Sequence, residues 1–447
     1  MILIHNATII NEGNSFTGSL LLVREKIGRI FRDSVPEALL RICRRVIDAR
    51  NLWLMPGVID DHVHFREPGL THKGDFFTES RAAVAGGVTS CMDMPNTRPQ
   101  TVTRDALRRK AEMVAGRSAV NYAFYLGATA DNRKELERAD YSQVCGVKVF
   151  IGSSTGGMLV DSEKILQRIF RQVDALIAVH CENEEVIRVN TDIYGRRYGV
   201  DIPVQCHPLI RSAEACYRSS AQAVEMADRY GTRLHVLHLS TAREMTLFDA
   251  GKPDRKRITA EVCIPHLWFF DLDYGRLGTR IKWNPSVKTA GDRHALQEAL
   301  KSGKLDLIAS DHAPHLPGEK SGGALQAASG GPLVQHSLQV MLELARKGLF
   351  TRELVAEKMC HAPARLFRIR HRGFIREGYY ADLVLTDPHK LHTVCRDNLQ
   401  YRCGWSPFEG ETFSNSVHTT IVNGNIVYEK GRVIEGAIHG QALEFDR

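Results

Sequence analysis

Short apolar runs alternate with helix-like segments through the middle of the chain, from residue 56 to residue 365. Strand-like runs cover residues 147–150, 176–180, 234–239 and 305–310, and helix-like segments at 162–173, 184–188 and 242–248 follow the first three. Strands that alternate with helices favour a parallel sheet. The segment spans roughly 310 residues, the size of a (β/α)8 TIM-type barrel with insertions. We therefore predict an α/β fold built on such a barrel.

Both ends of the chain have a different sequence pattern, with short strand-like apolar runs separated by polar turns. Residues 1–55 contain apolar runs at 2–4, 7–10 and 20–23. Near the other end, Asn423-Gly424 separates two β-branched runs, which is a strong hairpin signal. We predict that residues 1–55 and 366–447 together form a small discontinuous β-sandwich domain, and that residues 56–365 form the barrel.

Composition and charge exclude several classes of protein. The chain has 447 residues with 59 Lys+Arg and 52 Asp+Glu, a formal net charge of +7 that is scattered rather than gathered in a stripe. This argues against nucleic-acid binding. Apolar residues make up 43% and charged residues 25%, values typical of a globular protein. No apolar run approaches the ~18 residues of a membrane helix, and the first residues lack the pattern of a secretory signal.

The ten cysteines are spread singly from Cys43 to Cys403, with no C-x-x-C pair. In a chain of this size that pattern indicates free thiols in a reducing compartment. We therefore expect a cytoplasmic protein.

Two histidines follow the apolar run at residues 52–59. His62 and His64 are two positions apart, so both imidazoles point to the same face of an extended chain. Neutral imidazoles that converge at the carboxyl end of a barrel strand are typical of a metal site. Two histidines hydrogen-bonded within a loop would give the same pattern, so this motif alone leaves both interpretations open.

Four other predicted strands also end in residues that can bind a metal. Lys148, His180 and His238 end three of them, and residues 310–315 (SDHAPH) end the fourth. We prefer His238 to His235 because the two are three apart on a strand, face opposite ways, and His238 lies nearer the carboxyl end. Such strand ends meet at one mouth of a barrel. The set is too large for one tetrahedral zinc and suits two metals about 3.5–4 Å apart.

Lys148 is the unusual member of this set. An ammonium group would be repelled by two cations, whereas a neutral amine can add carbon dioxide and become a carbamate with one oxygen for each metal. An ordinary lysine with its stem on apolar surface is the alternative, and the sequence pattern alone favours it.

The segment H-V-H-F-R-E-P-G at residues 62–69 resembles the amidohydrolase superfamily, and within it the dihydroorotases with a long H-x-H-x-R-E-P-G segment. The resemblance covers nearly the whole chain. Its other motifs lie at residues 56–60, 86–89, 94–97, 148–150, 179–182, 238–240, 284–285, 311–315, 378–384 and 422–424.

The resemblance implies two Zn²⁺ per chain and carbon dioxide bound as a lysine carbamate. It assigns one zinc to His62, His64 and Asp311, the second zinc to His180 and His238, and the bridge between them to carbamylated Lys148. Asp311 would also be the general acid and base of the reaction.

The resemblance further implies a pocket for a small acidic ring. Arg66, Asn96 and His315 would bind its carboxylate, His64 would also contact it, and Asn284 with the backbone of Gly330 and Gly331 would hold the ring. Arg66 fits on physical grounds, because a guanidinium binds a carboxylate through two hydrogen bonds and residue 66 continues the parity of 62 and 64 if the strand stays extended. A surface arginine paired with Glu67 is the alternative for Arg66, and a turn residue is the alternative for Asn96.

A dihydroorotase interconverts dihydroorotate and N-carbamoyl-L-aspartate in pyrimidine (UMP) biosynthesis, through a zinc-bound hydroxide. The resemblance also makes a homodimer the expected assembly and a carbamoyltransferase a possible partner. Hydantoinases, dihydropyrimidinases and allantoinases share the metals and remain alternatives, as does a non-catalytic scaffold. Residues 329–331 (SGG) depart from the family's usual Phe-Gly pair, and the Gly- and Ala-rich residues 316–329 are a candidate lid.

Overall fold

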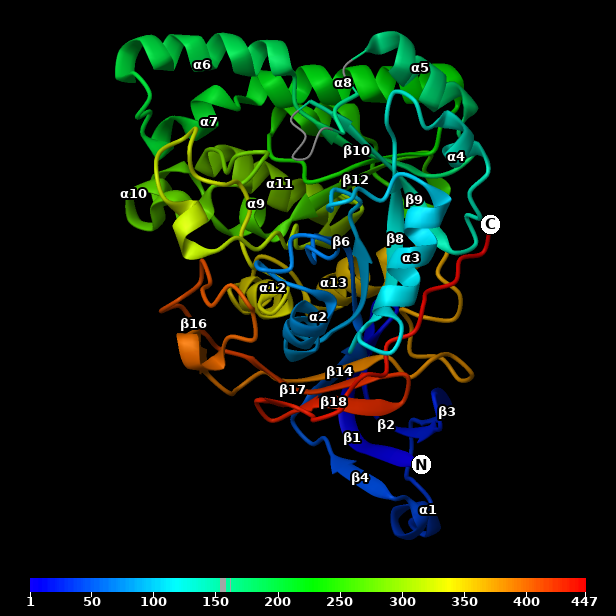
Figure 1. Cartoon of the computed structure of the whole chain (residues 1–447). Helices are drawn as coiled ribbons and strands as arrows, with labels where there is room; N and C mark the ends of the chain where they lie inside the picture. Colours follow the sequence, from blue (N-terminus) through cyan, green and yellow to red (C-terminus); the bar gives the residue numbers. More distant parts are fainter. Residues whose placement is uncertain (153–157, 161) are drawn as a thin grey trace.

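The computed structural model describes residues 1–152, 158–160 and 162–447. Its larger part is a barrel of eight parallel strands, in which each strand pairs with the next one along the chain (Figure 1). The strands are β6 (Val58–Val63), β7 (Val88–Asp93), β8 (Asn121–Gly127), β9 (Val144–Ile151), β10 (Ile177–Cys181), β11 (Leu234–Val236), β12 (Ile258–Cys263) and β13 (Leu307–Ala309). A parallel bridge between Val63 and His312 joins the last strand to the first. The predicted barrel is confirmed.

The barrel strands are buried along almost their whole length, which explains their continuous apolar runs. Every residue of β6 to β11 is buried, as expected where helices cover the outside of a parallel sheet. The main surrounding helices are α2 (Phe76–Ala85), α3 (Arg104–Val114), α5 (Glu163–Gln172), α6 (Glu184–Tyr198), α8 (Ala213–Tyr230), α11 (Ala290–Ser302) and α12 (Ser337–Arg346). In α8, the Ser212 side chain caps the first turn and Gly231 ends the helix at a φ of 67°.

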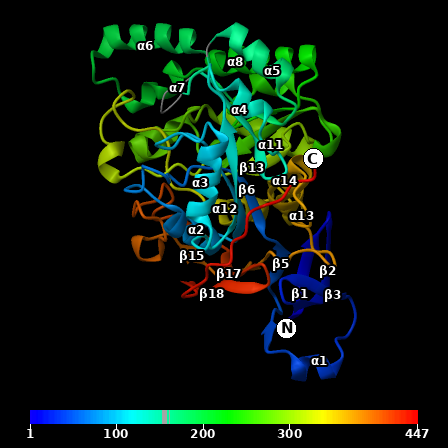
Figure 2. The ribbon, with the colours of Figure 1, turned by 45° about the vertical axis from the view of Figure 1, so that its right-hand side comes forward.

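Both chain ends build a second sheet below the barrel, as predicted (Figures 1 and 2). Its nine strands are β1 (Ile2–Asn11), β2 (Asn14–Val23), β3 (Lys26–Phe31), β4 (Arg45–Asp48), β5 (Trp53–Pro56), β14 (Leu383–Asp387), β17 (Ser416–Val422), β18 (Asn425–Glu429) and β19 (Arg432–Val433). Strand β14 pairs with β5 and so joins the two ends. The hairpin between β17 and β18 turns at Asn423 and Gly424, with φ angles of 48° and 73°.

Three local elements differ from the expected ranges. Strand β11 stops at Val236 rather than continuing to residue 239, and the expected helix at 242–248 is a 3-10 turn, Arg243–Leu247. Helix α6 runs to Tyr198, well beyond residue 188. The apolar run after β11 is buried in the loop that lines the barrel mouth, so its hydrophobicity reflects burial rather than strand pairing.

After β19 the chain returns to the barrel, where Leu443 and Gln441 make backbone hydrogen bonds with Tyr122. The red segment of Figure 1 follows this path to the C-terminus. The division of the chain after residues 55 and 365 stays a prediction.

All ten cysteines lie in the described residues, and none forms a disulfide. Within the described ranges, no helix is both long enough and apolar enough to cross a membrane.

Candidate active site

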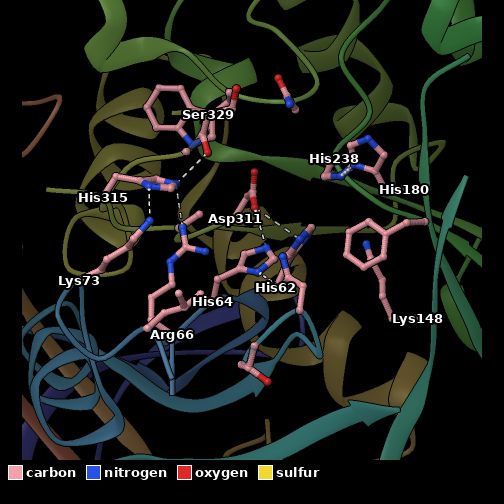
Figure 3. A pocket seen from close by; sticks show the side chains of 18 of the residues that line it. His62, His64, Arg66, Lys73, Lys148, His180, His238, Asp311, His315 and Ser329 are labelled. Carbon is pink, nitrogen blue, oxygen red and sulfur yellow. Dashed lines mark hydrogen bonds and ion pairs between the residues drawn. The ribbon is translucent and has the colours of Figure 1, made fainter. Parts of the chain in front are cut away.

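The carboxyl ends of the barrel strands surround a cavity of about 230 Å³. Its walls bring together the six predicted metal ligands and most of the predicted substrate-binding residues, although they come from segments far apart in the sequence (Figure 3). One half of the cavity is lined by histidines, Asp311 and Lys148. The other half is lined by Arg66, Lys73 and His315.

A first group of potential metal ligands consists of His62, His64 and Asp311. The Nε2 atoms of both histidines lie 3.4 Å from Oδ1 of Asp311. Nδ1 of His62 donates to Glu261 over 2.9 Å and Nδ1 of His64 donates to Asn96 Oδ1 over 2.7 Å. In the neutral form of each ring the proton is on the far side and an Nε2 lone pair faces the Asp311 carboxylate, an arrangement that a cation stabilises.

A second group consists of His180 and His238. Nδ1 of His180 and Nε2 of His238 are 2.9 Å apart. Nε2 of His180 donates to Glu182 over 3.0 Å, so its Nδ1 keeps the lone pair, and Glu182 is held in turn by Arg211 at 2.5 Å. Burial holds the pKa of both imidazoles below its ordinary value, which keeps them neutral and able to bind a metal.

Lys148 lies in β9 beside these groups and is almost fully buried. Its Nζ faces the Phe150 ring, 4.7 Å from the ring centroid (Figure 3). No hydrogen bond or ion pair from the described ranges holds this Nζ. Burial lowers its pKa to about 8, so about a tenth of the amine is neutral and nucleophilic at pH 7, far more than for an ordinary lysine. These properties fit carbamylation better than a surface lysine.

The donor set therefore fits a pair of metal ions. Burial lowers the pKa of His64 to about 4, whereas Glu261 and Asp311 outweigh burial and raise the pKa of His62. The charge of His62 and the hydrogen bond from His64 hold the pKa of Asp311 below its usual value despite burial. A bound cation would take the place of the His62 proton. Neutral imidazoles and an ionised carboxylate are the forms that bind a divalent cation. His62, His64 and Asp311 lie close enough together to share one ion.

The opposite half of the cavity is built for an anion. Arg66 is 7% exposed, and no carboxylate in the part of the chain that the structure describes forms an ion pair with it. Its Nε donates to Pro314 O over 3.0 Å and its Nη2 lies 3.1 Å from His315 Nε2. Burial lowers the pKa of Arg66 to about 10, so it stays charged at neutral pH.

Lys73 and Ser329 favour one tautomer of His315. Nζ of Lys73 lies 3.0 Å from His315 Nδ1 and 2.6 Å from Glu319. Ammonium and guanidinium groups can only donate, and a neutral imidazole accepts at one nitrogen, so His315 can accept from Lys73 at Nδ1 or from Arg66 at Nε2 but not from both. The Ser329 carbonyl beside Nε2 favours the tautomer with the ring proton on Nε2, in which Nδ1 accepts from Lys73. That proton points to Ser329 O at 3.1 Å. Burial, with Arg66 and Lys73 nearby, lowers the pKa of His315 and keeps it neutral. In this tautomer Nε2–H donates to Ser329 O and cannot accept from Arg66, so the Nη2 hydrogens of Arg66 are left to bind a ligand (Figure 3).

The remaining predicted residues lie at different distances from the cavity. Asn96 lines it and connects its two halves, since its Oδ1 holds His64. Asn284 lines it with a buried Oδ1 that has no hydrogen-bond partner among the described residues. Gly330 lines the cavity, whereas Gly331 packs behind it against Trp283 and has no room for a Cβ.

Two site residues lie beyond the ends of their strands, so the alternation of side chains along a strand does not predict where they point. His238 lies beyond the end of β11 with a φ of 40°, and Arg66 lies beyond β6 with a φ of 70°. His235 does not face away from His238: its imidazole also lies inside the barrel, at a deeper level. Glu67, the alternative partner of Arg66, pairs instead with Arg117 at 2.8 Å.

Sequence reasoning missed Lys73, Glu182 and Glu261, which orient the predicted residues. Glu182 follows His180 by two positions, so strand parity could have found it. Lys73 and Glu261 carry no local signal, because their contacts join segments far apart in the chain.

The 316–329 segment contains a short 3-10 helix, Pro317–Lys320. The buried ammonium of Lys320 donates to Lys282 O, Ala328 O and Gly330 O at 3.2, 2.7 and 2.8 Å. These contacts hold the segment against the barrel, and they favour a fixed wall of the cavity over a mobile lid.

Comparison with known proteins points to one family. The model of the amidohydrolase family matches residues 53–427. A dihydroorotase of Methanosarcina mazei is 34% identical over 398 residues, which cover 86% of this chain and 84% of the relative. An allantoinase of Salmonella paratyphi B is 28% identical over 443 residues, with 96% and 95% covered. The solved structure of L-hydantoinase (dihydropyrimidinase) from Arthrobacter aurescens superposes with a TM-score of 0.91 at 27% identity, with 99% of each chain covered.

Proposed function

The chain belongs to the amidohydrolase family and is a cyclic amide hydrolase by its relatives, and from this premise we propose that it is a dihydroorotase. It would hydrolyse dihydroorotate to N-carbamoyl-L-aspartate and catalyse the reverse ring closure. The relatives named above include enzymes for three different rings, so the substrate has to be argued from the cavity.

The observation that carries the proposal is the buried Arg66, which pairs with no carboxylate of the described residues. A guanidinium inside the protein with no carboxylate partner is costly unless a ligand supplies the negative charge. His315 lies next to Arg66, and both line the same cavity as Asn96. Dihydroorotate carries a ring carboxylate that would bind here, whereas hydantoin and dihydrouracil carry none.

The metal half of the cavity fits the chemical step. His62, His64 and Asp311 would hold one zinc, His180 and His238 the other, and carbamylated Lys148 would bridge them. When bound, two zinc ions supply Lewis acidity, which makes water a better nucleophile near neutral pH and polarises an amide carbonyl.

Asp311 would move the proton. Its ionised carboxylate accepts a proton from the water that attacks the ring carbonyl, and delivers it to the ring nitrogen as the C–N bond breaks. In ring closure the same carboxylate takes the proton from the ureido nitrogen. The substrate carboxylate would be bound by Arg66, Asn96 and His315. The ring would contact Asn284 and Gly330, and His64 would lie between the carboxylate site and the metal ligands. This positioning would place the amide carbonyl over the metals.

The cellular role follows from the activity. A dihydroorotase would act in pyrimidine (UMP) biosynthesis, and we expect it in the cytoplasm as a homodimer, with a carbamoyltransferase as a possible partner.

An assay of the purified protein tests the proposal. Interconversion of dihydroorotate and N-carbamoyl-L-aspartate would be measured on a sample of known metal content, beside hydantoin, dihydrouracil and allantoin. We expect turnover of the carboxylate-bearing ring with about two zinc ions in the cavity. Turnover of hydantoin or allantoin with dihydroorotate left intact would contradict it, and a metal-free, inactive protein would favour a scaffold.

A further inference from the structure

A second cluster of buried polar groups lies inside the barrel, next to the candidate metal centre but outside the substrate cavity. It consists of Asp61 on β6, His235 on β11 and Glu261 on β12, all 0% exposed. Nε2 of His235 lies 3.6 Å from Asp61 Oδ2 and 3.8 Å from Glu261 Oε2. None of the three belongs to the ligand set or the substrate pocket described above.

The polar atoms that face one another in this cluster are unsatisfied. Both carboxylate oxygens of Asp61, Nε2 of His235 and Oε2 of Glu261 have no hydrogen-bond partner within the described ranges, and neither does the Tyr125 hydroxyl nearby. Burial and the Asp61 carboxylate hold the pKa of that hydroxyl above its usual value. Tyr125 is therefore close enough to Asp61 for an electrostatic interaction. Unsatisfied buried atoms are costly, and several in one place indicate a missing occupant.

The hydrogen bonds around His235 determine which way its lone pair points. The Thr259 hydroxyl donates its proton to Leu234 O at 3.1 Å, so its oxygen accepts from His235 Nδ1–H at 2.9 Å. Nε2 faces two carboxylates, and Asp61 and Glu261 outweigh burial and raise the pKa of His235 to about 9, so a proton or a metal cation has to occupy this position. A proton on Nε2 would relieve the repulsion, yet 3.6 and 3.8 Å are too long for hydrogen bonds to either carboxylate. A cation between the three side chains would satisfy all of them.

The spacing agrees with this interpretation. Ligands on a tetrahedral zinc lie about 3.3–3.6 Å apart when the bonds are about 2.0–2.2 Å long. The group His62, His64 and Asp311 has spacings of 3.4 Å, and the buried cluster is only slightly wider. All three of its ligand atoms lie within 4.8 Å of one another.

We propose that Asp61, His235 and Glu261 form a third, structural cation site that binds a divalent transition metal such as Zn²⁺ or Mn²⁺. Two carboxylates and one imidazole are a suitable donor set for such an ion, which also neutralises their buried charge. The site ties β6, β11 and β12 together. It also supports the candidate active site, because the other oxygen of Glu261 accepts from His62 Nδ1 and from the His238 backbone N–H, each at 2.9 Å.

Zinc counting on the full-length protein tests this site, whatever ring the enzyme hydrolyses. After saturation with Zn²⁺ and removal of the excess, D61N is expected to hold one zinc fewer per chain than the wild type. Its matched control is D60N. Asp60 is the buried neighbour, but its Oδ1 already accepts from the His62 and Ser310 backbone N–H groups, so an amide can replace it. D60N is expected to keep the wild-type count.

Crystals of the zinc-saturated wild-type protein give a second, independent readout, which also serves if D61N does not fold. Anomalous scattering at the zinc edge is expected to give a peak between Asp61, His235 and Glu261, separate from any peak in the substrate cavity. The same crystals grown with Mn²⁺ should show the peak at the manganese edge. A map without this peak, or an unchanged zinc count in folded D61N, would overturn the proposal and leave His235 as a buried imidazolium.

Discussion

The two halves of the cavity have opposite electrostatic character. In the half lined by the histidines, burial lowers the pKa of His64, His180 and His238, so neutral lone pairs converge there. In the other half, Arg66 and Lys73 converge on a neutral imidazole, with Glu319 as the nearby anion of the Lys73 pair. The first half calls for cations and the second for an anion.

This difference separates chemistry from specificity. Under the proposed function the metal half would activate water for any cyclic amide, and this chain is similar to relatives named for three different rings. The cationic half decides which ring is held over it. Substitutions in the metal half should therefore reduce turnover of every substrate, whereas substitutions in the cationic half should reduce turnover of carboxylate-bearing rings alone.

Metal removal should have the largest effect. A chelator is expected to abolish turnover, and zinc with bicarbonate should restore it, while zinc without bicarbonate should restore it poorly after prolonged carbon dioxide depletion. Because burial lowers the pKa of Lys148 to about 8, the neutral amine becomes more abundant as pH rises from 6.5 to 8.5, and recovery should become faster. Full recovery in the absence of bicarbonate would argue against the carbamate.

Asp311→Asn should come next. We expect kcat to fall by about 10²- to 10⁴-fold, the usual contribution of a general acid or base, while much of the zinc remains because His62 and His64 are intact. Steady-state rates and zinc content of the same preparation check this. Near-normal kcat in a zinc-loaded variant would remove Asp311 from its catalytic role.

Arg66→Lys should have a smaller and selective effect. Losing the two-point contact should cost about 1.5–3 kcal/mol, or about 10- to 100-fold in kcat/KM for dihydroorotate, mainly through KM. Arg117→Lys is the matched control, since Arg117 pairs with the adjacent Glu67 outside the cavity. An unchanged KM in Arg66→Lys would contradict the assignment of the carboxylate site.

Lys73→Met should have the smallest effect. Without the ammonium donor, His315 is free to place its proton on Nδ1, so we expect KM to rise about 3- to 10-fold, the value of one neutral hydrogen bond. Glu319→Gln keeps the contact between Lys73 and His315 and should change KM less. Nitrogen NMR of the His315 ring would report the tautomer directly, and a proton on Nδ1 in the wild type would refute the argument.

The barrel and the metal ligands were predictable because they follow from local patterns. Apolar runs fix where the barrel strands lie. His62, Lys148 and His180 lie in the carboxyl-terminal halves of β6, β9 and β10, and Asp311 follows β13 by two residues. Apolar runs predicted the strand ends less well where residues are buried but not paired in the sheet, as at residues 237–239 beyond β11.

Contacts between distant segments were not predictable. Glu261 reaches His62 across 199 positions and His315 reaches Lys73 across 242, so neither pair leaves a local periodicity. The positive φ of Arg66 and His238 also escapes strand parity, because these residues lie in loops whose shape is set by packing at the barrel mouth.

The most direct test of the central claim compares two rings that differ only in the carboxylate. Purified zinc-loaded protein would be assayed with dihydroorotate and with dihydrouracil, and kcat/KM would be measured for each. The buried Arg66, which pairs with no carboxylate of the described residues, predicts that kcat/KM for dihydroorotate is higher by about 100-fold or more, and that Arg66→Lys shrinks this ratio. Equal values for the two rings in the wild type would contradict the account.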